Sequence, residues 1–171
     1  SVLAARDRPD EALEVIREVV MLARPSMDAQ ALWPAVVGLS HCALVRGLRA
    51  EAESALDEVT SSIAASESAG DVQQWHVELI LLLVLAGRFE DATAIVERLA
   101  AGVWRDACRA VLEERHADAA DILEGTGEQP LQAELRLRAA TIFVAEGRLA
   151  EAQAQLDRAR AFWRSVGATA L

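Results

Sequence analysis

Three short segments carry residue types that can catalyse reactions, bind metals or bind nucleotides. His41 and Cys42 are adjacent, but neighbours on a helix point about 100° apart, so they do not form a base and nucleophile pair on their own. Glu113 and His116 have the spacing of half a di-iron site, yet a second half is missing and a helix corner is expected here. The Gly-Thr-Gly loop at 125–127 lacks the longer glycine pattern of a dinucleotide fingerprint. We therefore predict no catalytic residue, no metal ligand and no cofactor.

The basic residues exclude further chemistries, because all 17 of them are arginine. A phosphate-loop ATPase and Schiff-base catalysis both need a lysine, so this chain does not carry either of them. The formal net charge of -10 argues against nucleic acid, whose binding needs a clustered basic surface. From Pro130 onward, however, arginines outnumber acidic residues. This end is either a solvated helix face or a docking surface for an acidic neighbour.

Cysteine use and hydropathy indicate the compartment. Cys42 and Cys108 are the only cysteines, a number typical of reduced, buried thiols in a cytoplasmic protein. The longest apolar run, Leu79 to Ala86, is less than half of what a membrane-spanning helix requires. The chain opens with Ser1 inside a helical pattern, so we expect a single helical domain, 1–171, cut from a longer polypeptide.

A short phrase that recurs along the chain predicts how helices are arranged. The phrase consists of a turn, a polar spacer and then an alanine. It occurs with a glycine in the turn at 47–52, 87–92 and 147–152, and without that glycine at 7–12 and 114–119. Glycine tolerates the left-handed conformation that ends a helix, and the acidic residues that follow suit the first turn of the next helix. Apolar residues four, seven and eleven positions after the alanine complete a stripe that packs on the preceding helix, at Leu56, Val59, Ile63, Val96, Leu99, Leu156 and Trp163 among others.

Helices of matching length precede these corners, at 28–46, 71–86, 101–113 and 131–146. The phrase and the helices together predict an all-α fold of about nine helices, stacked as antiparallel pairs. The expected repeats are 28–67, 71–100, 101–124 and 130–166, after a partial repeat at 1–24.

These corners resemble the tetratricopeptide repeat, whose period is about 34 residues. The resemblance implies a right-handed superhelix with a concave groove. Three features depart from the family pattern: no proline closes the repeats, most tryptophan-leucine pairs are lost, and the usual glycine of the first helix is replaced by Ser40, Ile80, Ala107 and Ala140. The longer spacing of the first repeats is similar to divergent arrays in bacterial signalling ATPases, cyclase-linked regulators and transcriptional regulators, and the arginine bias suits a GC-rich bacterial genome.

The resemblance also implies which residues line the groove. The family's groove positions fall in the first helix of each pair, here at Pro34, Val37, His41, Leu44, Gln74, Val77, Leu81, Val84, Ala101, Trp104, Cys108, Leu112, Glu134, Leu137, Thr141 and Val144. This lining is mainly apolar and contains one charge, and the chain has neither lysine nor asparagine, so a clamp for acidic peptide tails is excluded. The alternative is that these positions are core, because apolar spacing does not separate groove from core. Burial is also the simpler expectation for each tryptophan.

We therefore predict a non-catalytic interaction module of a larger bacterial regulator. Its apolar groove would bind a peptide, an amphipathic helix or a neighbouring domain of the same polypeptide. A different class of function is an effector sensor that binds a small molecule or peptide pheromone. Self-association through the apolar strip into a homodimer is the third hypothesis, and no membrane or nucleic-acid contact is expected.

Overall fold

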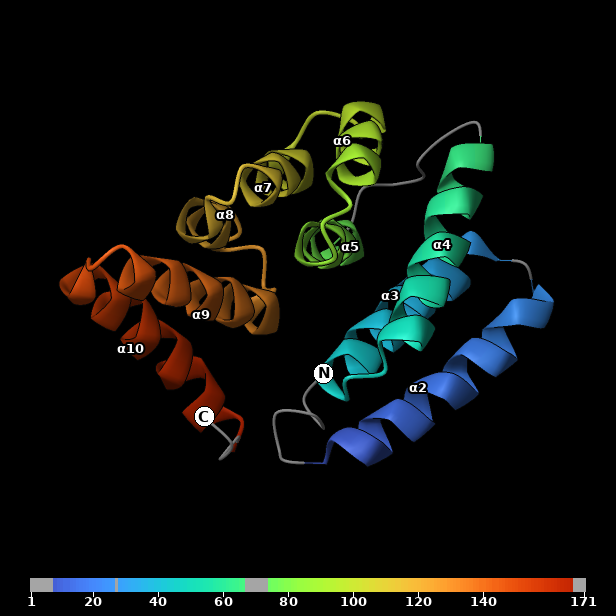
Figure 1. The fold of residues 1–171 in the computed structure, drawn as a ribbon, viewed down its shortest axis with the longest axis horizontal. Coiled ribbons are helices and arrows are strands. Elements are labelled where there is room, and N and C mark those ends of the chain that lie inside the picture. Colours follow the sequence, from blue (N-terminus) through green and yellow to red (C-terminus); the bar gives the residue numbers. More distant parts are fainter. Residues whose placement is uncertain (1–7, 27, 67–73, 168–171) are drawn as a thin grey trace.

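The computed structural model describes residues 8–26, 28–66 and 74–167, and within these ranges the chain is entirely helical. Nine α-helices are present there, with one 3₁₀ turn and no strand: α2 (Pro9–Ala23), η1 (Arg24–Ser26), α3 (Ala29–Val45), α4 (Arg49–Ala65), α5 (Gln74–Leu85), α6 (Phe89–Arg98), α7 (Val103–Leu112), α8 (His116–Ile122), α9 (Gln129–Ala145) and α10 (Leu149–Ser165). The all-α prediction is confirmed. In Figure 1 the helices follow one another along an arc from α2 in blue to α10 in red.

The corners between paired helices have the predicted geometry. Gly47 and Gly147 take φ of 71° and 77°, in the left-handed region that glycine enters without strain. The residue after each glycine donates its N–H to a carbonyl five residues back, as from Arg148 to Phe143 at 2.8 Å, which is the Schellman pattern of helix ends. Where the phrase lacks glycine, Glu114 takes φ of 57° and the same bond forms. The corner therefore persists without its best residue.

The alanines of the phrase lie where helices meet, as predicted. Ala12, Ala52, Ala92, Ala119 and Ala152 are each at most 3% exposed, and small side chains let backbones approach closely. In α4 the stripe that follows, Leu56, Val59 and Ile63, is 0% exposed. In α10 the equivalent Leu156 is only half-buried. Leu156 is thus less buried than Leu56 of the same predicted stripe, because fewer helices surround the last pair.

The core divides into a large part and a small one. The large cluster runs continuously from α2 to α8 and includes Leu135 of α9. Its centre is α5, in which every residue from Leu79 to Val84 is at most 7% exposed, as expected for a helix packed between neighbours. Both α3 and α7 pack against α5. The second cluster is built on Ala133, Ala159 and Trp163 of α9 and α10.

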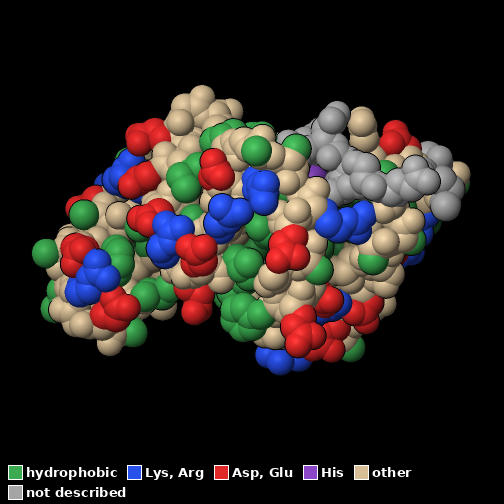
Figure 2. All heavy atoms as spheres, turned by 90° about the horizontal axis from the view of Figure 1, so that it is seen from above, with side chains coloured by type: hydrophobic (Ala, Val, Ile, Leu, Met, Phe, Trp, Pro, Cys, Tyr) green, Lys and Arg blue, Asp and Glu red, His purple; other side chains and the backbone are tan. Residues whose placement is uncertain are grey.

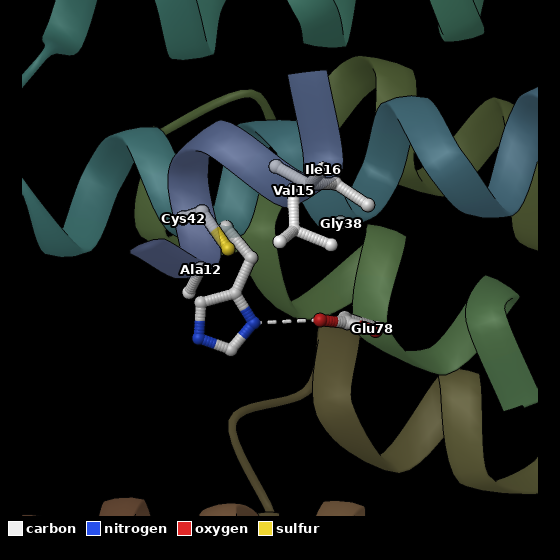
Figure 3. Close-up of a pocket in the computed structure, with 7 residues that line it drawn as sticks. Ala12, Val15, Ile16, Gly38, Cys42 and Glu78 are labelled. Atoms are coloured by element: carbon white, nitrogen blue, oxygen red, sulfur yellow. Dashed lines mark hydrogen bonds and ion pairs between the residues drawn. The ribbon is translucent and has the colours of Figure 1, made fainter. Parts of the chain in front are cut away.

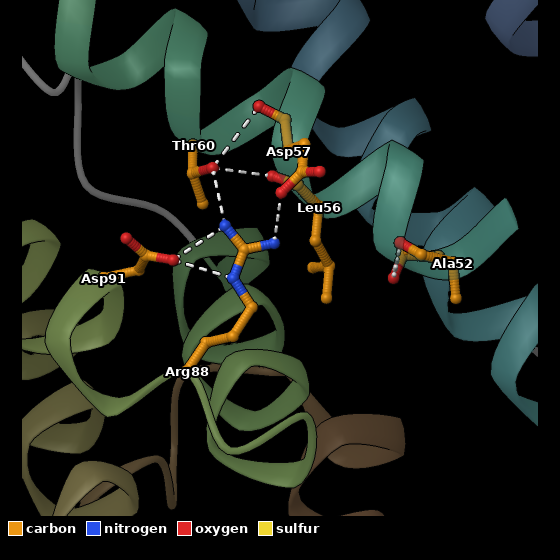
Figure 4. A network of polar contacts seen from close by, with 7 residues as sticks. Ala52, Leu56, Asp57, Thr60, Arg88 and Asp91 are labelled. Carbon is orange, nitrogen blue, oxygen red and sulfur yellow. Dashed lines mark hydrogen bonds and ion pairs between the residues drawn. The ribbon is translucent and has the colours of Figure 1, made fainter. Parts of the chain in front are cut away.

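Arginine side chains connect the second helices of successive pairs. Arg17 of α2 donates two hydrogen bonds to Glu51 of α4, at 2.8 and 2.6 Å, and Arg158 of α10 contacts Asp121 of α8. Figure 4 shows Arg88, which donates to Asp57 of α4 at 2.6 Å. Such exposed pairs contribute at most about 1 kcal/mol each, and the two-pronged geometry of Arg17 with Glu51 favours one orientation of α2 and α4.

The surface carries both signs of charge. Figure 2 shows one face on which acidic and basic side chains alternate around apolar side chains. In the described part of the chain, none of the helices has the length and apolar character needed to cross a bilayer.

Candidate functional site

The predicted groove residues of the central helices lie in the core. Val37, Val77 and Cys108 are 0% exposed, and Leu81 and Val84 are at most 7% exposed. Their side chains pack within the large cluster of α2 to α8. The groove interpretation is therefore wrong at these five positions, and the core alternative describes them, because α5 packs against both α3 and α7.

The remaining predicted residues keep some exposed surface. Thr141 and Val144 of α9 are exposed, as is Ala101. Half-buried side chains occur at Pro34, His41, Leu44, Trp104, Leu112, Glu134 and Leu137. The side chain of Gln74, at the start of α5, lies outside the described residues. The surviving positions lie on α3, on α9 and on α7 with the residues just before it, whereas the described positions of α5, which packs between α3 and α7, are buried.

One of these survivors, His41, lines a pocket where α2, α3 and α5 meet. The pocket has a volume of about 220 Å³ and is lined by Ala12, Val15, Ile16, Gly38, His41, Cys42 and Glu78. Figure 3 shows these side chains converging from the three helices. The walls from α2 are apolar, and the charged group comes from α5. The pocket therefore combines an apolar enclosure with one polar contact point, which is the composition typical of binding sites.

The polar contact point is the pair of His41 and Glu78. His41 Nδ1 lies 2.6 Å from Glu78 Oε1, and the two side chains are 24% and 32% exposed. Burial opposes the charge of Glu78, but the hydrogen bond and the charge of His41 outweigh it and lower the pKa of Glu78 below 4.5. Glu78 is therefore a carboxylate at neutral pH. Nδ1 is engaged by this contact, and among the residues that the structure describes none forms a hydrogen bond with Nε2 or with the second carboxylate oxygen.

Close packing of α2 on α3 shapes the pocket. A Cβ added at Gly38 would stand 3.2 Å from Ile16 Cδ1, a distance tighter than ordinary carbon contacts. Glycine at this position lets α2 approach α3, and Val15 then lies at the rim of the pocket. A larger residue at position 38 would require the Ile16 side chain to shift.

An exposed apolar stripe of α2 continues from the pocket. It consists of Val15, Val19 and Leu22, which are 46%, 43% and 67% exposed and share one helix face because their spacing is i, i+4, i+7. The opposite flank of α2 packs on the core through Leu13 and Val20. We call this face, with the pocket, the α2 surface. Large side chains with this exposure on one face are typical of an interaction site.

The sequence analysis missed most of this site, although the sequence contains two signals of it. Glu78 is the only charged residue of α5, and a single carboxylate in an apolar helix needs a partner. The spacing of Val15, Val19 and Leu22 also extends the apolar face of α2 beyond what one neighbour covers. The partner of Glu78, His41, comes from 37 residues away, so the pair itself was not visible in the sequence.

The pocket chemistry favours binding over nucleophilic attack. Cys42 is 4% exposed, and burial raises the pKa of its thiol, so the sulfur is protonated at neutral pH and is a poor nucleophile. Burial also raises the pKa of Cys108, to about 12. Elsewhere, Glu113 pairs with Arg115, and the described residues contain no group of three or more His, Cys, Asp or Glu side chains arranged for a metal.

Comparison of the chain with family models, with curated proteins and with solved structures finds no match.

Proposed function

We propose that the chain is a non-catalytic binding module of a larger bacterial regulator, working in the cytoplasm. Its α2 surface holds a short segment of a protein, from a separate partner or from another domain of the same polypeptide. One side chain of that segment enters the pocket, and neighbouring apolar side chains lie on Val15, Val19 and Leu22.

The size of the pocket is the observation that carries this proposal. Small-molecule sites usually enclose about 300–1,000 Å³, whereas this pocket measures about 220 Å³ and is open on one side. That space suits one amino-acid side chain better than a whole effector molecule. A peptide also uses the adjacent apolar stripe, which a molecule confined to the pocket would leave exposed.

The pocket selects for a side chain with an apolar body and a polar end. The body would contact Ala12, Val15 and Ile16, and the end would meet Glu78 or the free ring nitrogen of His41. Leaving either polar group buried without a partner would cost about 1–3 kcal/mol. A purely aliphatic side chain is therefore disfavoured.

Selection from a displayed peptide library against the folded chain tests the proposal. We expect enriched peptides whose binding is lost in Val15→Asp, because a carboxylate placed on the apolar rim removes the contact and must be desolvated. The matched variant is Val144→Asp, at a valine of α9 that is 54% exposed and far from the pocket in sequence. Circular dichroism and thermal melting of both variants show that each is folded.

The two variants separate the competing sites. Loss of binding in Val144→Asp alone would place the partner on α9, on the last part of the groove expected from the sequence, and would overturn the α2 surface. Binding unaffected by either variant would overturn both. If no peptide is enriched and small apolar effectors raise the melting temperature instead, the chain is an effector sensor.

A further inference from the structure

We infer that the segment bound by the α2 surface is cationic and amphipathic, a short basic helix with one apolar face. This inference rests on the proposed function and adds the chemistry of the partner. It comes from charges that surround the stripe and from the carboxylate inside the pocket.

Acidic side chains border the apolar stripe along its solvent side. Glu11 and Glu18 are four and three residues from Val15, which places them beside it on the helix surface. Glu14 and Glu18 are exposed. Among the ion pairs formed by residues that the structure describes, none involves Glu14 or Glu18. Neither carboxylate is held by such an ion pair, although the hydrogen bonds to α4 and, to a lesser extent, the charge of Glu14 raise the pKa of Arg17.

Arg8 pairs with Glu11, but the other arginines near the stripe are engaged by acids that lie away from it. Arg17 and Arg24 each donate two hydrogen bonds to acidic residues of α4. Arg46 pairs with Asp10 at 2.7 Å. Arg17 and Arg24 of α2 thus face α4, which leaves Glu14 and Glu18 as acidic groups beside the stripe that can attract a basic partner.

The pocket adds a carboxylate, paired with His41, at the end of the stripe. Glu78 is ionised, and one of its oxygens is held by His41 at 2.6 Å. The other oxygen can accept hydrogen bonds from an arginine or lysine whose methylene groups lie against Ala12 and Ile16. Basic side chains commonly bury their stems in this way while the charged end finds a carboxylate.

The geometry also limits the length of the segment and disfavours a second copy of the chain. From Val15 to Leu22 the stripe spans about 10 Å along the helix axis, at 1.5 Å per residue, so two to three turns of a partner helix cover it. Two α2 surfaces brought face to face would oppose their own glutamates, and like charges in contact are unfavourable. Charge complementarity therefore selects a basic partner over self-association.

Three synthetic helical peptides test the inference by fluorescence anisotropy on the full chain. The first places leucines on one face and lysines or arginines elsewhere. The second has the same leucines with glutamates, and the third is a scramble of the first. We expect the basic amphipathic peptide to bind at least about tenfold more tightly than the other two, and to weaken as salt is added.

Variants of the chain identify the charges responsible. The double variant Glu14→Gln, Glu18→Gln should weaken the basic peptide by about fivefold, and Glu78→Gln should weaken peptides that carry a basic residue for the pocket. The matched control, Glu53→Gln with Glu97→Gln, changes net charge equally at two exposed residues of α4 and α6 and should have little effect. An equal loss in the control, or equal binding of the scrambled peptide, would overturn the inference as general charge attraction.

Failure of the inference differs from failure of the proposed function. If library peptides lose binding in Val15→Asp but prove neutral or acidic, the α2 surface is the site and its preference for cations is wrong. If the basic peptide binds Val15→Asp as well as it binds the unchanged chain, the α2 surface is not where it binds.

Discussion

The central helices and the last helical pair use the same repeat positions in opposite ways. Val37 of α3 and Val77 of α5 are 0% exposed, whereas Val144 of α9, from the same expected groove, is 54% exposed. In the centre, α5 is packed between α3 and α7. In the described part of the chain α9 has its main contacts with α8 and α10, so its remaining face is open.

This difference shows that a repeat motif specifies a helical hairpin and leaves its outer face undetermined. Valine at a groove position is core when another first helix packs on it and surface when none does. Exposed apolar surface then lies on helices that lack a neighbour on one side. The exposed stripe of α2 is such a place, and it continues into the pocket at His41 and Glu78.

The largest expected difference in stability comes from placing a charge in each region. Val77→Glu should cost more than about 4 kcal/mol, because it buries an unpaired carboxylate, whereas Val144→Glu should change stability by less than about 0.5 kcal/mol. Urea unfolding followed by circular dichroism measures both. A stable, folded Val77→Glu protein would show that α5 is not a core helix.

Removing one leucine from each region gives a smaller contrast. Leu56 of α4 is 0% exposed, so Leu56→Ala should cost about 2–5 kcal/mol. Leu156 of α10 is half-buried, and Leu156→Ala should cost only about 1 kcal/mol. Equal losses in thermal or urea unfolding would mean that the last pair is covered as fully as the centre.

The corners allow a comparison between a glycine and its replacement. Gly147→Ala should cost about 1–2 kcal/mol, because alanine is strained at φ of 77°. Glu114→Gly should leave stability unchanged or raise it by up to about 1 kcal/mol, since glutamate already sits in the left-handed region at φ of 57°. Destabilisation by Glu114→Gly would indicate that its side chain stabilises the corner by more than the strain costs.

The smallest expected effect is a pH dependence at α8, which lies between the two regions. Burial, with a contribution from Arg138, lowers the pKa of His116 below its ordinary 6.5. As pH falls below 6.5 the unfolded chain takes up a proton that the folded chain does not. Stability should therefore decrease as pH falls from 6.5 to the folded pKa, and level off below it.

His116→Gln supplies the control for this prediction. Its unfolding free energy should be flatter with pH in that window, whatever its absolute value. Some carboxylates, such as Glu51 and Glu151, have a pKa lowered from the ordinary value of 4.5. Their protonation changes stability only below about pH 4.5, so it does not affect the upper part of the pH window of His116. Identical pH profiles of the two proteins would show that His116 titrates normally.

Much of the fold could be predicted because its signals are local. Helices α3 and α9 begin and end within two residues of their predicted limits, since apolar periodicity and corner glycines act over a few neighbouring residues. Ala52 and Leu56 were placed correctly for the same reason. The candidate site was less predictable: of the expected groove residues, His41 lies in the pocket, whereas its partner Glu78 and the rim residue Val15 were not found.

The sequence alone determined where helices start, where the chain reverses and which residues of each hairpin face each other, because these follow from backbone preferences and from contacts within one turn or one corner. Only the tertiary structure decided which apolar faces are buried and which carboxylate meets which histidine. Those outcomes depend on helices brought together from distant parts of the chain: α3 supplies His41 and α5 supplies Glu78, 37 residues apart. Burial is a property of the neighbours a residue acquires, and the spacing of apolar residues does not contain that information.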